Sequence, residues 1–376
     1  MKLARPAAIL AASLALASCT AMDVAESPPA RAAMRLAPVD LAAWQTLETE
    51  PFRGKRDSIS FGDPLHGWYG TGAGDLFRTA DGGSSWQKVA SRPGTFVRAV
   101  AFLDEMNGFI GNIGTDYYPG VEDDTPLYRT RDGGATWQPV ELDGQTIKGV
   151  CAIDVLRTER IYQGNLTPRT VIHAAGRVGG PAHILRSVDG GETWRKLDLG
   201  DQAGMILDIK FLDENTGMVF AATTSSSRDA EGLVLRTTDG GESWTEVYRS
   251  GRPHELIWKA SFPGGGDIGY ATVQSYDQER ATQLVIKTVD GGRSWQELEI
   301  AQNAKARQFG IGFIDADTGF VGTFSGGYAT SDGGATWREV PIAPAANKFD
   351  VVPHEGGGRI YAIGTQVQML EFDWME

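Results

Sequence analysis

Residues 79–86 read Thr79-Ala80-Asp81-Gly82-Gly83-Ser84-Ser85-Trp86, and this stretch decides the fold because it returns five more times. The other copies occupy residues 130–137, 187–194, 237–244, 288–295 and 330–337. All six keep Ser or Thr, Asp, Gly, Gly, Ser or Thr, and Trp at the same offsets. The Asp recurs mostly about every 50 residues, with extremes of 42 and 57. A period of this length predicts one repeat fold rather than several unrelated domains.

The chemistry of this repeat, which we refer to as the Asp box, points to a rigid turn between two strands. The carboxylate can accept hydrogen bonds from the backbone N–H groups that follow it, and the hydroxyls can bond to the same turn. The Gly-Gly pair supplies backbone angles that residues with a Cβ resist. The Trp begins the next strand and should pack in an apolar layer. We therefore expect a structural role for Asp81, Asp132, Asp189, Asp239, Asp290 and Asp332, and for Trp86, Trp137, Trp194, Trp244, Trp295 and Trp337.

A second pattern precedes most of the boxes: a Phe, an Asp two residues later, and a turn that ends in Gly and an apolar residue. It occurs as Phe61-Gly62-Asp63, Phe102-Leu103-Asp104, Phe211-Leu212-Asp213 and Phe313-Ile314-Asp315. This pattern predicts a hairpin between an inner strand and the next strand. The third repeat departs from it through an insertion around residues 155–168. Each repeat should thus hold four antiparallel strands, with the Asp box between the third and the fourth.

The chain after the sixth box supplies three further strands, at residues 349–352, 359–363 and 367–371, and no seventh box. The missing fourth strand is found near the other end, where Trp44-Gln45-Thr46-Leu47 matches Trp86-Gln87-Lys88-Val89. We therefore predict an all-β chain that folds as a single seven-bladed β-propeller over residues 41–376. The N-terminal strand completes the last blade, and this closure protects free sheet edges.

The N-terminal residues have the features of a targeting segment. Residues 1–18 carry a basic start and an apolar stretch too short to span a bilayer, as in a secretory signal peptide. The stretch ends in Leu16-Ala17-Ser18-Cys19, which resembles the bacterial lipobox and implies lipidation of Cys19 after cleavage. Residues 19–40 are predicted to be a flexible tether. We expect a lipid-anchored protein of the cell envelope that faces the periplasm, and Thr20 after the Cys is compatible with the outer membrane.

The composition argues against several functional classes. The formal net charge is −13, whereas non-specific nucleic-acid binding needs a basic surface. The five His and two Cys lack metal-ligand spacing, so we expect neither a metal nor a cofactor. The glycine-rich residues 70–74 have no following helix, which argues against a dinucleotide-binding loop. Cys151 lies in an apolar run and is expected to be a buried thiol. We expect a monomer.

The spacing of the Asp boxes, the Phe-x-Asp turns and the single propeller after a signal peptide resemble the photosystem II assembly and stability factor family. This family lies within the wider BNR-like superfamily, and the resemblance covers residues 41–376. It implies a propeller without established catalysis that binds partner proteins through an arginine-rich surface. The Asp boxes alone are less specific, because sialidases, xyloglucanase-type glycoside hydrolases and sortilin-like receptors also carry them. In these proteins the boxes generally lie away from the binding face.

A basic funnel mouth is the candidate binding surface. In each repeat we counted back four residues from the aromatic residue of the inner strand, or from the residue that takes its place. This position holds Arg98, Lys148 and Lys348 in three repeats. In two other repeats a cation, Arg56 or Lys259, lies one residue away from this position. These positions begin the inner strands and should ring the central funnel on the face opposite the boxes. Such a ring on an acidic protein favours an acidic partner segment or an anionic ligand. The alternative is that the five residues are scattered and solvated.

Two loops should open onto the same face. The loop at residues 114–124 carries Tyr117 and Tyr118, which could anchor a contact with envelope or membrane proteins. The loop at residues 275–283 carries Tyr276 and Arg280 among other polar residues. The alternative for each loop is a variable solvated segment.

Two functions stay open from the sequence. The first is a non-catalytic binding or assembly scaffold, and the second is a sialidase-like glycoside hydrolase that acts on extracellular or envelope glycans. Residues Pro51-Phe52-Arg53-Gly54 match the sialidase Phe/Tyr-Arg-Ile-Pro motif only in part. A xyloglucanase-like enzyme would use two propellers and a carboxylate pair, and this chain has length for one propeller. A funnel pocket with three arginines, a tyrosine and two carboxylates would favour the sialidase-like function.

Overall fold

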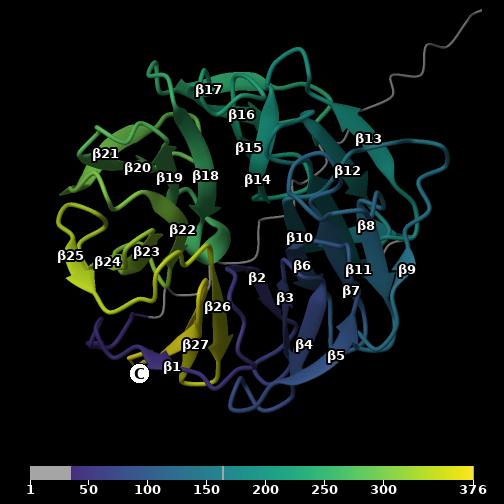
Figure 1. Cartoon of the computed structure of the whole chain (residues 1–376), viewed down its shortest axis with the longest axis horizontal. Coiled ribbons are helices and arrows are strands. Elements are labelled where there is room, and N and C mark those ends of the chain that lie inside the picture. The colour runs from purple at the N-terminus through teal and green to yellow at the C-terminus, as the bar shows by residue number, and fades with distance from the viewer. Residues whose placement is uncertain (1–34, 163–164, 376) are drawn as a thin grey trace, which may run out of the picture. The chain divides into compact units, whose positions relative to one another are not determined.

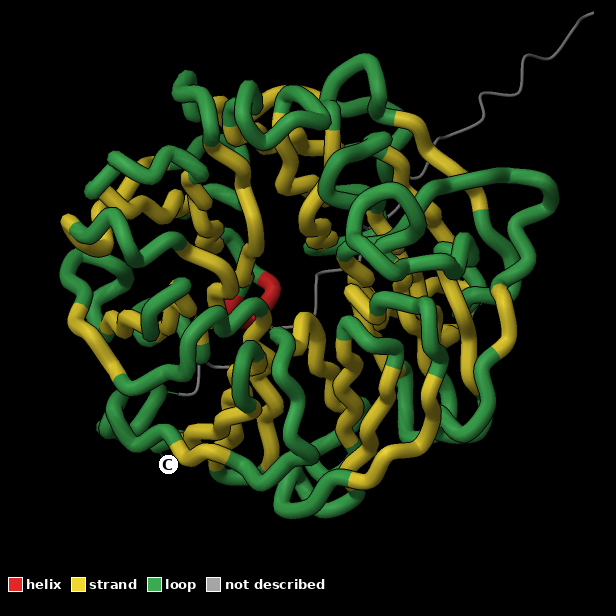
Figure 2. Tube along the Cα trace, viewed as in Figure 1, coloured by secondary structure: helices red, strands yellow, loops and turns green. Residues whose placement is uncertain are grey.

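The structure is a computed structural model that describes residues 35–162 and 165–375, and the statements below concern these residues. Seven four-stranded antiparallel sheets surround a common centre, so the predicted seven-bladed, all-β architecture is confirmed (Figure 1). The only helical element of the described chain is the short 3-10 turn η1 (Pro263–Gly265), drawn in red in Figure 2. The signal peptide, Cys19 and most of the predicted tether lie outside the described residues.

The first three blades follow one another along the chain, each starting with its inner strand. Blade 1 contains β2 (Arg56–Phe61), β3 (Gly67–Thr71), β4 (Asp75–Thr79) and β5 (Gln87–Ser91). Blade 2 contains β6 (Val97–Phe102), β7 (Gly108–Asn112), β8 (Leu127–Thr130) and β9 (Gln138–Pro139). Blade 3 contains β10 (Ala152–Tyr162), β11 (Asn165–Ala175), β12 (His183–Ser187) and β13 (Arg195–Asp198). The insertion noted in the third repeat therefore lengthens the β10–β11 hairpin.

The next three blades repeat the same order. Blade 4 contains β14 (Met205–Phe211), β15 (Gly217–Ala222), β16 (Gly232–Thr237) and β17 (Thr245–Arg249). Blade 5 contains β18 (Glu255–Ser261), β19 (Gly269–Ser275), β20 (Thr282–Thr288) and β21 (Gln296–Gln302). Blade 6 contains β22 (Gln308–Phe313), β23 (Gly319–Thr323), β24 (Gly327–Thr330) and β25 (Arg338–Val340).

Blade 7 is built from both ends of the described chain. It contains β26 (Lys348–His354), β27 (Gly357–Ile363), β28 (Val367–Asp373) and the outer strand β1 (Gln45–Thr46). Gln45 pairs with Met369 and Thr46 with Gln368, and the C-terminal end lies beside β1 in Figure 1. The predicted closure by the N-terminal strand is therefore confirmed.

The Asp boxes form the turns between the third and fourth strands of blades 1–6. In the first box, Asp81 Oδ1 accepts hydrogen bonds from Thr79 Oγ1 at 2.7 Å and from the backbone N–H of Ser85 at 2.9 Å. Ser85 Oγ donates to Asp81 Oδ2 at 2.6 Å. Gly82 and Gly83 have φ values of 68° and 90°, which favour glycine. The same bonds recur in the other five boxes, so each box carboxylate is bound within its own turn.

The two sequence patterns meet in space. In five blades the box Trp lies edge-on to the Phe that begins, or corresponds to, the Phe-x-Asp turn, with ring centroids 6.0–6.3 Å apart. These pairs are Trp86–Phe61, Trp137–Phe102, Trp244–Phe211, Trp295–Phe262 and Trp337–Phe313. Edge-to-face contacts of this kind add to the stabilisation that burial alone provides. Within a blade, the Trp therefore packs the Asp-box turn, between the third and fourth strands, against the Phe-x-Asp turn, between the first and second strands.

Side chains of the inner strands link neighbouring blades. Asp154 Oδ2 accepts from the backbone N–H of Phe211 at 2.9 Å, and Asp208 Oδ2 accepts from Ala260 at 2.9 Å. Asp350 Oδ2 does the same for Phe61 at 2.8 Å. These bonds satisfy backbone donors that face a neighbouring blade instead of a hydrogen-bonded strand. These three carboxylates near the centre of the ring thus hold neighbouring blades together.

Five of the seven inner strands contain a bulge. In β2 the pairing with β3 shifts between Arg56 and Ser58, and in β6 the pairing with β7 shifts between Val97 and Ala99. Similar shifts occur in β14, β18 and β22. A bulge inserts an unpaired residue and changes which side chains share a face. In β2 and β6 the extra residues are Asp57 and Arg98, and both line the centre of the ring.

Candidate binding site at the propeller mouth

A cavity of about 580 Å³ opens on the face opposite the Asp boxes. Its walls come from the segments that precede the inner strands and from the loops between second and third strands. Eight aromatic residues line it: Phe52, Phe96, Tyr117, Tyr118, Trp258, Tyr276, Phe309 and Phe324. Four cationic residues join them, namely Arg53, Lys55, Arg98 and Arg307, together with one carboxylate, Asp57. We call this cavity the mouth.

The floor of the mouth is organised by one shared carboxylate. Asp57 is 2% exposed, and its Oδ1 lies 2.8 Å from Lys55 Nζ and 3.3 Å from Arg98 Nη1. Burial opposes ionisation of Asp57, but the two cations outweigh it and lower the pKa of the carboxyl. Arg98 is itself 4% exposed and lies over the Trp258 ring at 5.3 Å, and its buried Nη1 has no hydrogen-bond partner within the described ranges. Two cations therefore share a single negative charge at the floor.

The wall formed by blades 5 and 6 carries a second arginine. The Arg307 guanidinium lies 4.8 Å from the Tyr276 ring centroid, 5.5 Å from Phe309 and 5.6 Å from Phe324. Its buried Nε has no hydrogen-bond partner in the described part of the chain. Phe324 is exposed, so this wall presents an apolar surface with an embedded positive charge.

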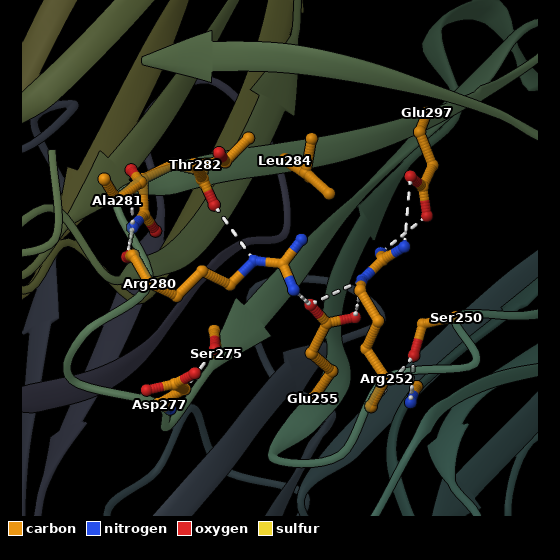
Figure 3. Close-up of polar contacts among 12 residues, drawn as sticks. Ser250, Arg252, Glu255, Ser275, Asp277, Arg280, Ala281, Thr282, Leu284 and Glu297 are labelled. Atoms are coloured by element: carbon orange, nitrogen blue, oxygen red, sulfur yellow. Dashed lines mark hydrogen bonds and ion pairs between the residues drawn. The ribbon is translucent and has the colours of Figure 1, made fainter. Parts of the chain in front are cut away.

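An ion network beside the mouth anchors the loop that carries Tyr276 (Figure 3). Glu255 is 1% exposed and lies between two arginines, 3.0 Å from Arg252 Nε and 2.7 Å from Arg280 Nη1. Arg252 also reaches Glu297 at 2.6 Å. Arg280 belongs to the loop at residues 275–283, so its charge is used to hold this loop against the start of β18. The ion pair between Arg280 and Glu255 therefore fixes this loop and, with it, the position of Tyr276 in the wall of the mouth.

The two tyrosines of the other predicted loop do line the mouth. Tyr118 is 54% exposed, and its ring lies 5.1 Å from that of Phe96. Tyr117 is also exposed in part, and burial of its hydroxyl foremost raises its pKa to about 12. Arg177 holds the loop by donating to the carbonyl of Thr115 at 2.7 Å. The loop at residues 114–124 is therefore part of the mouth wall.

The five predicted cations are distributed over different places. Arg98 lines the mouth, whereas Lys259 and Lys348 line a smaller cavity deeper in the centre of the ring. Arg56 points between blades, where its guanidinium donates to the carbonyls of Glu50 and Thr365 at 2.8 Å each. Lys148 is exposed and lies outside the lining of both cavities.

Sequence reasoning missed several residues of the mouth. Lys55, Arg53 and Arg307 lie in the segments just before the inner strands, one to three residues from the positions that we counted. A search for cations throughout these connecting segments would have found them. The aromatic lining gives a weaker signal, because its members come from seven different strands or connecting segments.

The described residues hold neither a candidate metal site nor a candidate membrane-spanning helix. No group of three or more His, Cys, Asp or Glu residues in the described ranges is arranged to hold a metal ion. Within the same ranges, no helix is long and apolar enough to cross a bilayer.

Comparison with known proteins supports the fold and leaves the activity open. No family model matches the chain. A xyloglucanase from Paenibacillus sp is 32% identical over 242 residues, which are 54% of this chain and 22% of that protein. Xyloglucanase Xgh74A from Acetivibrio thermocellus is 26% identical over 241 residues, 54% of this chain and 26% of that protein. The chain thus spans about a quarter of the length of these curated relatives.

Solved structures resemble the chain over a larger share of its length. YCF48 bound to D1 peptide has a TM-score of 0.59 and 17% identity, covering 93% of this chain and 100% of that one. This chain has the propeller fold of YCF48, a photosystem II assembly factor. YCF48 from Cyanidioschyzon merolae has a TM-score of 0.58 and 16% identity, covering 88% and 99% of the two chains. The GH74 enzyme of Niastella koreensis has a TM-score of 0.53 and 17% identity, covering 83% of this chain and 51% of that enzyme.

Proposed function

We propose that this protein is a non-catalytic propeller that holds a segment of an envelope or membrane protein at its mouth. The proposal includes a lipid anchor at Cys19 and a position in the cell envelope, facing the periplasm. It also includes the monomeric state. The similarity to YCF48, which has been solved with a D1 peptide, supports a role in holding another protein.

The composition of the mouth is the observation that carries this proposal. Its lining combines four cations with one carboxylate, on a protein whose formal net charge is −13. The eight aromatic residues offer large contact areas at small cost in side-chain entropy, as in protein-binding surfaces. A partner segment with acidic and apolar side chains fits both features, because the mouth attracts negative charge and buries apolar surface.

The second candidate is a glycoside hydrolase, which the xyloglucanase relatives favour. The mouth contains three arginines and three tyrosines, as a sialidase-like site would need, but one carboxylate among its described lining residues. Most glycosidases use two carboxyl groups that flank the scissile bond. Asp57 is ion-paired with two cations, and burial foremost raises the pKa values of Tyr117 and Tyr276, which disfavours a tyrosinate nucleophile. These features weigh toward the binding function.

Site-specific photocrosslinking tests the binding function. A photoreactive phenylalanine analogue is placed at Tyr118 in the mouth and, as a control, at Val289, an exposed residue of the fifth Asp box. We expect a discrete crosslinked partner in membranes from the Tyr118 position and not from Val289. The double variant Arg53→Glu/Arg307→Glu should lower its yield at least about tenfold, since close charge pairs across interfaces contribute about 1.5 kcal/mol or more. The matched control Arg338→Glu, on the outer strand β25, should keep the yield. Equal yields in all variants would contradict binding at the mouth.

A direct activity assay tests the second candidate. The purified protein is incubated with xyloglucan and with a panel of fluorogenic glycosides that includes a sialoside. The binding proposal predicts no turnover above the blank. Turnover that disappears in Asp57→Asn, while the variant keeps the melting temperature of the wild type, would replace the binding proposal with the enzymatic one.

A further inference from the structure

A second, smaller cavity of about 70 Å³ lies deeper in the centre of the ring than the mouth. Asp57 and Arg98 line both cavities, so the smaller one begins at the floor of the mouth. Three lysines from different inner strands also line it: Lys210 of β14, Lys259 of β18 and Lys348 of β26. We call it the central cavity.

Two of these lysines have a carboxylate partner. Lys210 Nζ lies 2.9 Å from Asp154 Oδ1. Lys259 Nζ lies 3.4 Å from Asp208 Oδ1 and donates to the carbonyl of Leu207 at 3.0 Å. Both carboxylates also accept a backbone N–H of the next blade through their second oxygen. The negative charges of Asp154 and Asp208 are therefore already matched by one cation each.

The other two cations of the central cavity are undercompensated. The side chain of Lys348 has one polar contact in the described part of the chain, a long one of 3.5 Å to the carbonyl of Val100, and no carboxylate within 4.0 Å. Arg98 shares Asp57 with Lys55, and its buried Nη1 has no hydrogen-bond partner among the described residues. A cation in a poorly solvated position whose counter-ion is shared or distant is only partly compensated, and it either loses its proton or acquires a further anion. Arg98 cannot lose its proton at any ordinary pH, so an additional anion is the way in which its charge can be compensated.

We infer that the central cavity binds one small monovalent anion of the size of chloride, between the Lys348 ammonium and the Arg98 guanidinium. A volume of about 70 Å³ accommodates such an ion with a water molecule, since a water occupies about 30 Å³ in the liquid. The cavity is too small for a peptide segment. Arg98 lines both cavities, but this site goes beyond the function proposed for the mouth, because Lys348 lines the central cavity and does not line the mouth.

The protonation of Lys348 should respond to the anion. Burial, with help from Lys210 and Lys259 and against the opposing effect of Asp350 and Asp208, lowers the pKa of Lys348 to about 8. A bound anion stabilises the ammonium form, so binding should take up a proton near pH 8 and weaken as the pH rises to about 9.5.

Bromide, which replaces chloride in such sites and scatters anomalously, provides the direct test. Crystals of the wild-type protein are soaked in sodium bromide at pH 7, and we expect an anomalous peak in the central cavity within hydrogen-bond distance of Lys348 Nζ. An ordered Lys348 without a peak in this cavity would overturn the inference.

Thermal unfolding provides the second test. Wild-type protein should melt at a higher temperature in sodium chloride than in sodium gluconate of equal ionic strength, with a shift that saturates as for one site. Lys348→Met should abolish this chloride-specific shift, while the control Lys287→Met, in the third strand of blade 5, should keep it. If Lys348→Met fails to fold, the bromide soak of the wild type decides. Retention of the full shift in a folded Lys348→Met protein would also overturn the inference, without bearing on the crosslinking at the mouth.

Discussion

Replacing Trp44 by Ala should destabilise the whole propeller, because this residue packs the N-terminal segment, which leads into β1, against blades 6 and 7. We call β1 the clasp strand, since its pairing with β28 closes the ring. The Trp44 side chain is 9% exposed, and its ring lies edge-on to Phe320 of blade 6 at 5.0 Å and to Phe349 of blade 7 at 6.1 Å. Among the described residues its indole Nε1 has no hydrogen-bond partner, so the substitution removes apolar contacts. Truncation of a buried Trp to Ala costs about 3–5 kcal/mol. The unfolding equilibrium should therefore shift by roughly a factor of 10² to 10³·⁵.

Urea unfolding followed by circular dichroism measures this change in free energy. The neighbouring substitution Gln45→Ala is a matched control, because the Gln45 side chain is exposed and the residue pairs with Met369 through its backbone. The control should stay within about 0.5 kcal/mol of the wild type. Deletion of residues 41–50 should lower the stability further, in one cooperative transition. The closure argument is refuted if Trp44→Ala costs no more than Gln45→Ala, or if the deletion leaves the melting unchanged.

Three further predictions follow from single groups. Burial opposes ionisation of Asp290, but hydrogen bonds from Ser294 and Thr288 outweigh it and lower its pKa to about 2. The stability that this box contributes is therefore present above the unfolded pKa of about 4 and is lost as the pH falls from 4 toward 2. Urea midpoints across this range should fall more steeply for the wild type than for Asp290→Asn, and parallel curves would contradict the stabilising role of the Asp290 carboxylate. Glu255→Gln should lower the free energy of unfolding by about 1–3 kcal/mol, because Arg252 and Arg280 lose a buried counter-ion. The exposed control Glu242→Gln should change it by less than about 0.5 kcal/mol. Similar urea midpoints for the two variants would contradict the role of Glu255 in anchoring the loop at residues 275–283. An alkyne fatty acid fed to cells that express the protein should label the wild type and leave Cys19→Ala unlabelled, and labelling of both would exclude lipidation at Cys19.

The fold was predictable from the sequence because its decisive interactions are local. The hydrogen bonds that each Asp-box carboxylate accepts are made within eight residues, so the pattern carries the geometry of its turn wherever it occurs. The clasp strand was recognisable for a similar reason, since Trp44-Gln45-Thr46-Leu47 copies the strand that follows a box. Trp44 in fact contacts Phe320 in the preceding blade much as Trp295 contacts Phe220, so the copy extends to the packing.

The mouth was predictable only in outline, because its residues are fixed by features that a sequence pattern does not contain. Lys55 and Asp57 line the mouth while Arg56 points between blades, and the bulge at Asp57 then shifts the register of the residues that follow in β2. In blade 3, which lacks the Phe-x-Asp pattern, the count gave Lys148, whereas Cys151, Ala152 and Ile153 are the residues of this segment that line the central cavity. Arg307 lies near Phe324 through the packing of blade 6, and no local pattern relates the two.

The placement of β1 has a consequence for the completion of the ring. Its partner β28 lies about 320 residues further along the chain, so the last blade cannot form before both distant segments have folded together. A partly folded chain that lacks this pairing exposes the apolar Trp44 side chain and an unpaired sheet edge, which are features that chaperones and proteases recognise. The arrangement thus makes completion of the ring a single, long-range event on which the survival of the whole molecule depends.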